Sequence, residues 1–223
     1  MNASNPVKLN LGCGLQVPQG WVNIDSSMGV RLAKMPVLRS MLSLIPTSSK
    51  WLPNKEWSSN VKWMNITRPF SYADNSVDVV YSSHTIEHLT YEEAKFVFNE
   101  SMRVLRPGGV IRIIVPDFGE IVQTYLEEQK KDPALAAKKF LTDTFYFEIP
   151  IPNTFSGLFK FYFKRKNNHY FLYDKPGLQH QLENAGFRNI SFKAWGESAI
   201  PNISEIDIPE RFNRAICIEA VKP

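Results

Sequence analysis

Two apolar runs separated by a helical pattern constrain the fold more than any other feature of the sequence. Residues 77–81 are Val-Asp-Val-Val-Tyr and residues 110–115 are Val-Ile-Arg-Ile-Ile-Val, as in buried strands. Between them, Thr90 and Glu93 match a capping box, and apolar residues follow at helical spacing up to Pro107-Gly108-Gly109. A strand, a helix and a strand in this order predict a βαβ unit with parallel strands.

Further segments extend this alternation. Apolar runs that predict additional strands span residues 7–11, 21–24, 61–66, 189–195 and 215–221. Asp117 can cap a helix with apolar positions at 121, 122, 125 and 126. Pro133 and the pair Asp174 and Pro176 open two more helical patterns. The sequence therefore predicts an α/β fold of about seven strands, mostly parallel and Rossmann-like, with helices on both faces of the sheet.

Composition narrows the class of protein. At 223 residues with 43% hydrophobic side chains, the chain suits one domain, 1–223, with a substantial core. The 26 basic and 22 acidic residues give a small positive excess, which permits an anionic substrate without requiring one. The two cysteines, Cys13 and Cys217, match neither a disulfide framework nor a zinc-binding spacing and favour a reducing, cytoplasmic location. We find no signal peptide and no apolar segment of the roughly 20 residues that span a bilayer, so no stable membrane insertion is expected.

Two stretches, about 28–60 and 140–173, interrupt the alternation and are interpreted as insertions over a site. The first contains an apolar run and then Trp51 and Trp57, and the second is rich in aromatic residues. A lid or a wall of an acceptor pocket is the preferred interpretation. The alternatives are a packing flap with a solvated basic edge at Lys164-Arg165-Lys166, a membrane-surface helix, or a nucleic-acid patch.

The first predicted strand runs into Gly12-Cys13-Gly14, and the second ends at Asp25. Such a turn brings backbone N–H groups close to a ligand, and an acidic strand end can accept two hydrogen bonds from a ribose diol. The third glycine of a dinucleotide fingerprint is absent, because Val17 stands in its place. Pro18 and Gly20 leave little room for a full crossover helix, so the first crossover is expected to be a short helix or a loop.

Four blocks carry a family resemblance in the family's order: residues 10–14, 20–25, 74–89 and 103–117. Together they resemble class I methyltransferases of the methyltransferase-11 type, and they look closest to small predicted methyltransferases associated with glycan modification. The resemblance implies a seven-stranded sheet whose last strand is antiparallel, with S-adenosyl-L-methionine across the carboxyl ends of the strands.

The resemblance also implies a set of cofactor contacts. Asn10 would contribute to cofactor binding, and the backbone of Gly12, Cys13 and Gly14 would face the methionine portion. Asp25 would hold the ribose hydroxyls. Asn65 stands where the family commonly has an acidic residue at the adenine amino group, and its carbonyl can still accept that hydrogen. Ser83 and His84 would lie beside the sulfonium and the acceptor.

Methyl transfer requires alignment of the two reactants, and a hydroxyl acceptor also requires removal of its proton. His84, at a strand end, is the first candidate for the base. His88 and Asp117 are further candidates, with a structural histidine and a helix cap as the respective alternatives. His169 and Tyr173 are candidates for acceptor binding.

The pattern His84-Thr-Ile-Glu-His88 also matches inverted zinc peptidases, but its position after a buried strand disfavours a peptidase. No metal is predicted, although a metal-assisted transferase similar to ubiquinone-biosynthesis methyltransferases stays open.

The favoured activity is O-methylation of a sugar hydroxyl or of another small-molecule or glycan acceptor. The alternatives are a natural-product methyltransferase and a non-catalytic module that binds S-adenosylmethionine. A nicotinamide-dependent oxidoreductase is disfavoured by Val17, and no nucleic-acid partner is expected. The sequence leaves the oligomeric state open.

Overall fold

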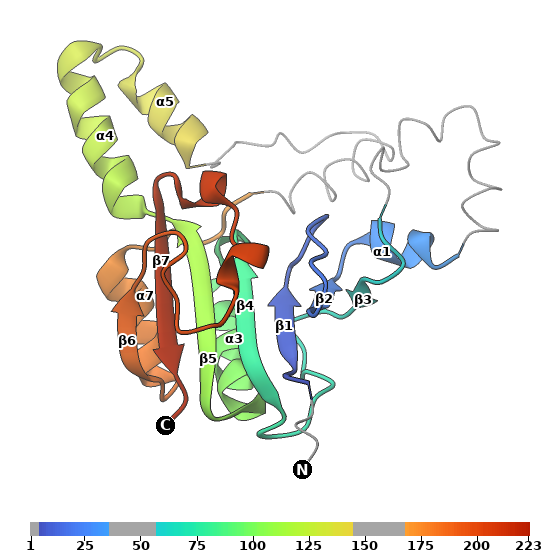
Figure 1. Cartoon of the computed structure of the whole chain (residues 1–223). Coiled ribbons are helices and arrows are strands. Elements are labelled where there is room, and N and C mark those ends of the chain that lie inside the picture. Colours follow the sequence, from blue (N-terminus) through green and yellow to red (C-terminus); the bar gives the residue numbers. More distant parts are fainter. Residues whose placement is uncertain (1–4, 36–56, 145–167) are drawn as a thin grey trace, which may run out of the picture.

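The computed structural model describes residues 5–35, 57–144 and 168–223 (Figure 1). Within these residues seven strands form one sheet in the order β3-β2-β1-β4-β5-β7-β6. The strands are β1 (Lys8–Leu11), β2 (Val22–Asp25), β3 (Lys62–Trp63), β4 (Val77–Ser83), β5 (Leu105–Pro116), β6 (Arg188–Phe192) and β7 (Ala215–Val221). Pairing is parallel from β3 to β5, and β7 runs antiparallel to both of its neighbours. The predicted Rossmann-like sheet with an antiparallel last strand is confirmed.

The helical elements described are α1 (Met28–Ala33), η2 (Ile86–His88), α3 (Tyr91–Val104), α4 (Phe118–Lys131), α5 (Ala136–Asp143), α7 (Lys175–Asn184), η3 (Ile203–Glu205) and η4 (Pro209–Phe212). The predicted capping box is present at the start of α3. Thr90 Oγ1 accepts from the Glu93 backbone N–H, and the Thr90 N–H donates to Glu93 Oε2 at 2.9 Å. Asp117 and Asp174 cap α4 and α7 in the same way, by accepting a backbone N–H three residues on.

The start of β5 differs from the sequence prediction. The strand begins at Leu105, so Pro107-Gly108-Gly109 lies inside it rather than before it. Opposite β4, the register shifts between Val77, which pairs with Leu105, and Val79, which pairs with Val110. The glycines stay in the ladder because the Gly108 N–H donates to Lys222 O and the Lys222 N–H donates to Gly109 O. Backbone pairing beyond the end of β7 thus extends the strand.

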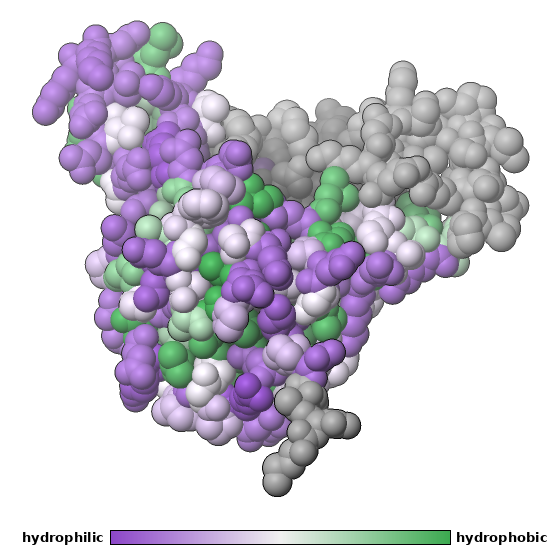
Figure 2. Space-filling model, viewed as in Figure 1, coloured by the Kyte–Doolittle hydropathy of each residue, from purple (hydrophilic) through white to green (hydrophobic). Residues whose placement is uncertain are grey.

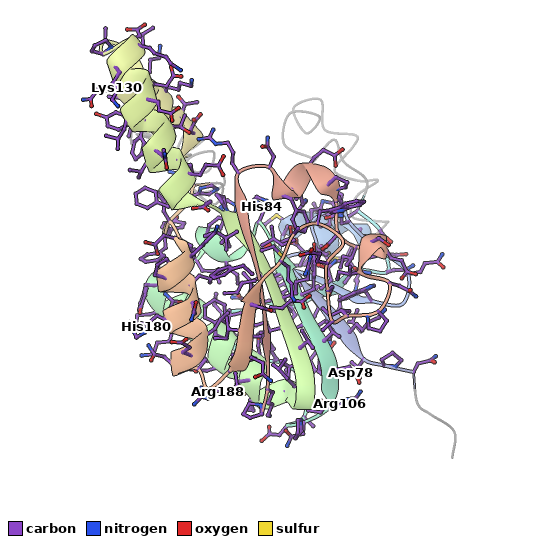
Figure 3. The ribbon with its side chains drawn as sticks, turned by 60° about the vertical axis from the view of Figure 1, so that its left-hand side comes forward. Asp78, His84, Arg106, Lys130, His180 and Arg188 are labelled. Carbon is purple, nitrogen blue, oxygen red and sulfur yellow. The ribbon has the colours of Figure 1, made fainter. Side chains whose placement is uncertain are left out.

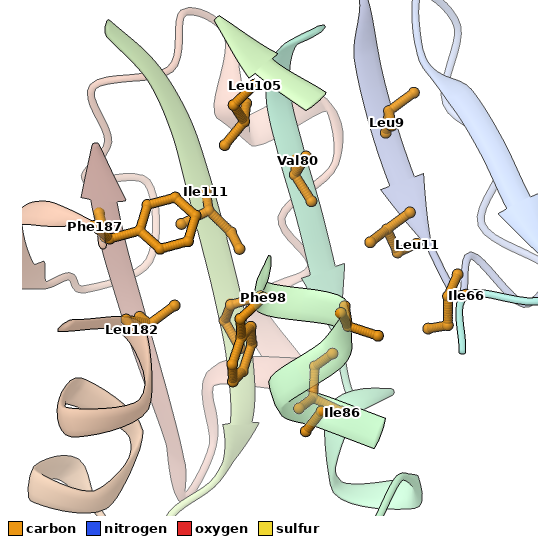
Figure 4. Close-up of a cluster of buried hydrophobic side chains, with 14 of the residues drawn as sticks. Leu9, Leu11, Ile66, Val80, Ile86, Phe98, Leu105, Ile111, Leu182 and Phe187 are labelled. Atoms are coloured by element: carbon orange, nitrogen blue, oxygen red, sulfur yellow. The ribbon is translucent and has the colours of Figure 1, made fainter. Parts of the chain in front are cut away.

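One face of the sheet is covered by α3 and α7 and forms the larger apolar core. Fully buried side chains from β1, β4 and β5 meet Phe98 of α3 and Leu182 of α7 there (Figure 4). Along β5 the alternate residues Ile111, Ile113 and Val115 point into this core, as the period of two in a strand requires. These two helices are therefore held by burial of apolar surface.

The opposite face is covered by the irregular segment 194–213, which contains η3 and η4. A smaller apolar cluster lies here, between Ile200, Ile203 and Ile206 of this segment and the sheet residues Trp21, Val79, Tyr81, Ile114 and Cys217. Arg112 of β5 points to this side and is fully buried. Its guanidinium contacts Asp207 Oδ2 at 2.5 Å and Glu219 Oε1 at 2.7 Å. The helices that cover this face are thus short 3₁₀ turns, joined to the sheet by a buried ionic group.

The first crossover, residues 12–21, contains turns and no helix, as predicted from Pro18 and Gly20. Beyond the carboxyl ends of the strands, α4 and α5 form a projecting pair whose surface is mainly hydrophilic (Figures 1 and 2). The predicted apolar stripe of α4 is only partly buried: among the described residues, Ile121 is buried and Leu126 is 50% exposed. The reason is that α4 packs chiefly on α5, through Tyr125 and Phe140, rather than on the sheet.

No helix among the described residues is long and apolar enough to cross a membrane. Most of the two insertions proposed from the sequence, 28–60 and 140–173, lies outside the described residues.

Candidate functional site

The candidate site lies at the carboxyl ends of β1, β2 and β4. The chain order of the sheet reverses between β1 and β4, because β2 and β3 follow on one side of β1 and β5 follows on the other side of β4. At such a switch point the loops leave in opposite directions and open a crevice where α/β proteins bind ligands. Three of the loops that carry predicted site residues leave the sheet here.

The turn after β1 requires glycine at two positions, for different reasons. Gly12 and Gly14 have φ angles of +67° and +55°, the left-handed region that suits glycine. A β-carbon on Gly12 would lie 2.3 Å from the Thr85 side chain, so Gly12 lets β1 and the end of β4 approach closely. At Gly14, a β-carbon would meet no atom of the described chain within 4 Å. The turn is therefore packed on one side and open on the other.

Asp25 at the end of β2 is oriented by two backbone donors. Its Oδ2 accepts from the Gly14 N–H at 3.0 Å and its Oδ1 accepts from the Ser27 N–H at 2.7 Å. Each carboxylate oxygen keeps a further lone pair, so the group can still accept hydrogen bonds from a ligand diol. Burial, followed by the charge of Asp25, raises the pKa of the Cys13 thiol to about 12. Cys13 thus remains a neutral thiol within the turn.

The two asparagines predicted to contact the cofactor already have partners within the chain. Asn10 is 3% exposed, and its Nδ2 donates to Asn23 Oδ1 at 2.9 Å and to Gln16 O at 3.3 Å. It therefore supports the glycine turn from within the sheet. Asn65, just past β3, accepts at Oδ1 from the backbone N–H and the hydroxyl of Thr67, both at 3.0 Å.

At the end of β4, His84 has a φ angle of +50°, which non-glycine residues rarely adopt and which is common at functional sites. The backbone N–H of His84 donates to Ile114 O, which holds this conformation against β5. Arg211 Nη1 donates to the Ser83 carbonyl at 2.9 Å. Ser83 is buried, and this hydrogen bond connects its backbone carbonyl to the segment 194–213, which covers the opposite face of the sheet.

Both ring nitrogens of His84 face acceptors. Nε2 lies 2.9 Å from Arg211 O, and Nδ1 lies 3.3 Å from Glu87 Oε1. Burial alone would lower the pKa of His84, but the hydrogen bond and charge of Glu87 and the bond to Arg211 O outweigh it and raise the pKa. A protonated imidazole has no lone pair with which to take a proton. This geometry favours a positioning role for His84 over the general base predicted first.

The hydrogen bonding of the His88 ring differs from that of the His84 ring. His88 Nδ1 lies 3.1 Å from Asn168 O, so in the neutral imidazole Nδ1 carries the proton and Nε2 has the lone pair. The His88 ring packs edge-on against His169, with 5.0 Å between centroids. Burial lowers the pKa of His169, which keeps that ring neutral. Glu87, His88 and His169 thus form a compact group whose ligand atoms all lie within 4.8 Å of one another.

The remaining predicted residues lie deeper or at the next strand end. Asp117 caps α4 through the Glu120 N–H and pairs with Tyr173 in an isolated bridge. Tyr173 is 1% exposed and belongs to the apolar core, and burial followed by the charge of Glu87 raises its pKa. Of the two predicted acceptor-binding residues, the structure brings His169 into the group at the end of β4 and places Tyr173 beneath it.

Sequence reasoning missed Thr85 and Arg211 as parts of the site. Thr85 was hidden because its role depends on Gly12, 73 residues away, whose carbonyl lies 3.3 Å from Thr85 Oγ1. Arg211 lies 128 residues from Ser83 in an irregular segment without a motif. Glu87 entered the sequence analysis only as part of the pattern from His84 to His88, and its burial could not be seen from the sequence.

A glycine turn, an acidic strand end and a switch point define a nucleotide-cofactor site in an α/β protein. Residues 9–113, a little under half of the chain, match the family described as "Methyltransferase domain". This stretch is a methyltransferase domain of the S-adenosylmethionine-dependent class, and S-adenosyl-L-methionine is the cofactor of that class.

Solved structures similar to the chain include S-adenosylmethionine-dependent methyltransferases. One from Thermotoga maritima, described as a possible histamine N-methyltransferase, has 14% identity and a TM-score of 0.48 over 100% of this chain and 84% of its own. One from Archaeoglobus fulgidus has 15% identity and a TM-score of 0.46 over 98% and 87%. Haemonchus contortus phosphoethanolamine N-methyltransferase 2, in complex with S-adenosyl-L-methionine, has 14% identity and a TM-score of 0.45 over 100% and 50%. These distant likenesses identify no acceptor. No curated protein is detectably similar to the chain.

Proposed function

We propose that the protein transfers the methyl group of S-adenosyl-L-methionine to a hydroxyl of a small molecule, with a sugar or glycan precursor as the first candidate. The observation that carries the cofactor part is the arrangement of Gly14 and Asp25. An open glycine turn lies beside a carboxylate that two backbone N–H groups hold in place, which suits the methionine portion and the ribose diol respectively. The sugar acceptor rests on the resemblance of the four sequence blocks to glycan-associated methyltransferases.

The residues at the end of β4 would serve the acceptor. A hydroxyl must lose its proton as its oxygen attacks the methyl carbon and the carbon–sulfur bond breaks, with the electron pair left on sulfur. His88 has the lone pair for this step, and His84 and Glu87 lie beside it. We assign His84 to positioning, with Asp117 at the neighbouring strand end. The two insertions, 28–60 and 140–173, would border the acceptor, because their described ends lie at this edge of the sheet (Figure 1).

The first experiment is calorimetric titration of the cofactor-free protein with S-adenosylmethionine, S-adenosylhomocysteine and NADH. We expect binding of the first two and none of NADH. Asp25→Ala should weaken S-adenosylmethionine binding at least about tenfold, since charge-assisted hydrogen bonds to the ribose are lost. Asp78→Ala is the matched control, because Asp78 pairs with Arg106 at the opposite end of the sheet (Figure 3). Binding of NADH alone, or equal losses in both variants, would overturn the cofactor assignment.

An acceptor screen then separates the remaining alternatives. Formation of S-adenosylhomocysteine with sugars would support the proposed acceptor, and formation only with aromatic or polyketide compounds would favour a natural-product methyltransferase. Cofactor binding without product across the whole screen would favour a non-catalytic module.

Both buried free thiols fit a reducing, cytoplasmic compartment. Localisation of a tagged chain in its source cell tests this assignment.

A further inference from the structure

The group at the end of β4 contains a buried carboxylate whose environment is unusual. Glu87 is 1% exposed, and apart from the contact with His84 neither of its carboxylate oxygens has a hydrogen-bond partner in the described chain. That contact is long, with His84 Nδ1 3.3 Å from Oε1. A buried carboxylate without full hydrogen bonding is costly, so such a group usually pairs with a cation or binds a metal.

The fold places two histidines against this carboxylate. His88 follows Glu87 in η2, and His169 is held nearby because the Tyr170 and Phe171 N–H groups both donate to the Glu87 carbonyl, at 2.8 and 3.2 Å. The bond between His88 and Asn168, 80 residues apart in the sequence, joins the same two segments. The proximity of the three side chains therefore has a structural cause in the backbone.

Hydrogen bonds to the backbone orient both histidine rings. The His88 Nδ1–H donates to a backbone carbonyl, which directs the unprotonated Nε2 away from that carbonyl, and metal-bound histidines are typically oriented in this way. His169 is buried beside the His88 ring, and its own ring hydrogen-bonds to the Thr144 backbone. We propose that Glu87, His88 and His169 bind one divalent first-row transition-metal ion.

Two imidazoles and one carboxylate suit Zn²⁺, Fe²⁺, Co²⁺ or Ni²⁺ better than Mg²⁺ or Ca²⁺, which prefer oxygen ligands alone. The ligand atoms lie within 4.8 Å of one another, and a tetrahedral Zn²⁺ would bring them to about 3.4 Å by side-chain rotation. Three protein ligands leave at least one coordination position open. A bound ion would occupy the His88 lone pair, so His88 could serve as the proposed base only in metal-free protein. The metal site itself requires no assumption about the methyl acceptor.

The test is titration of chelator-treated, full-length protein with Co²⁺, followed by the visible absorption of the bound ion, and with Zn²⁺ by calorimetry. We expect one ion per chain. Glu87→Gln and His169→Ala should each weaken binding at least about tenfold, as loss of a metal ligand does. His180→Ala is the matched control: His180 lies on the outer side of α7, far from His84, and hydrogen-bonds to Asn184 (Figure 3).

Several outcomes would overturn the site. The first is that the wild-type protein binds no stoichiometric ion, and the second is that all variants bind the ion equally well. The third is loss of binding in His180→Ala, which would mark an adventitious surface site. The wild-type titration decides the matter even if Glu87→Gln fails to fold, and His88→Ala provides a further ligand variant. Titration with S-adenosylmethionine in parallel keeps a failure of the metal site distinct from a failure of the cofactor assignment.

Discussion

The two faces of the sheet are covered by different physical means. On one face, α3 and α7 bury Phe98 and Leu182 in a continuous apolar core. On the other, the segment 194–213 is held by a small apolar cluster and by buried Arg112, Asp207 and Glu219. Apolar burial tolerates small shifts, whereas a buried charge needs its partners in place. The comparison indicates that the ionic face specifies one position for a segment that lacks long helices.

This difference matters for the site, because the ionic face reaches it. Arg211 belongs to η4 in the segment 194–213, and it donates to the Ser83 carbonyl while its own carbonyl accepts from His84. The apolar face reaches the site through the buried side chains of Ile86 and Tyr173. Precision at the end of β4 thus depends more on the irregular face than on the helical one.

The largest expected effect comes from Arg112→Met, which should lower the free energy of unfolding by about 3–5 kcal/mol, because Asp207 and Glu219 would be left buried without a counter-charge. Urea denaturation followed by circular dichroism measures it. The triple variant Arg112→Met, Asp207→Leu, Glu219→Leu should recover much of this loss, since no uncompensated charge remains. A loss below about 1 kcal/mol in the single variant, the range of exposed ion pairs, would contradict the ionic account of this face.

On the helical face, Leu182→Ala should cost about 3 kcal/mol of unfolding free energy, from lost apolar transfer and a residual cavity. The same denaturation experiment applies. Leu126→Ala on α4 is the control, because Leu126 is 50% exposed and its truncation should change stability by less than about 0.5 kcal/mol. Equal effects at both positions would mean that α4 is packed as firmly as α7.

The smallest effect concerns the two thiols, one at the glycine turn and one beneath the ionic face. Burial raises the pKa of both Cys13 and Cys217 to about 12. Only about one thiol in ten thousand would then be ionised at pH 8, so alkylation should be slow, should speed up as the pH rises toward that value, and should be complete on unfolding. Mass spectrometry of labelled peptides distinguishes the two sites. Faster labelling of Cys217 than of Cys13 would show that the ionic face opens separately.

The sequence predicted those parts of the fold that local patterns determine. The capping box at Thr90 and the strand 215–221 are found as predicted, because the residues that define them are neighbours along the chain. Gly14 and Asp25, 11 residues apart, could be assigned to one candidate site from the sequence for the same reason. Arg112 could not be interpreted in this way. It interrupts an apolar run, and its partners lie 95 and 107 residues further on, in positions that no periodicity predicts.

The candidate site shows the same limit. His84 was selected because it follows a strand, but its protonation depends on Glu87 and on Arg211 O, 127 residues away. Likewise, the meeting of His88 and His169 depends on backbone pairing between η2 and a distant segment. Residue type and spacing could propose the chemistry, whereas the assignment of roles required the tertiary contacts.

The two ends of α3 have different consequences for how the chain folds. Its first turn is closed by Glu93, three residues from Thr90, and can form as soon as the helix begins. Its last turn is closed by Lys222, whose Nζ donates to Met102 O, 120 residues away, at 2.7 Å. That contact must wait until the last strand has paired, since closing so long a loop is slow. The helix therefore acquires its beginning early in folding and its end only when the chain is almost complete.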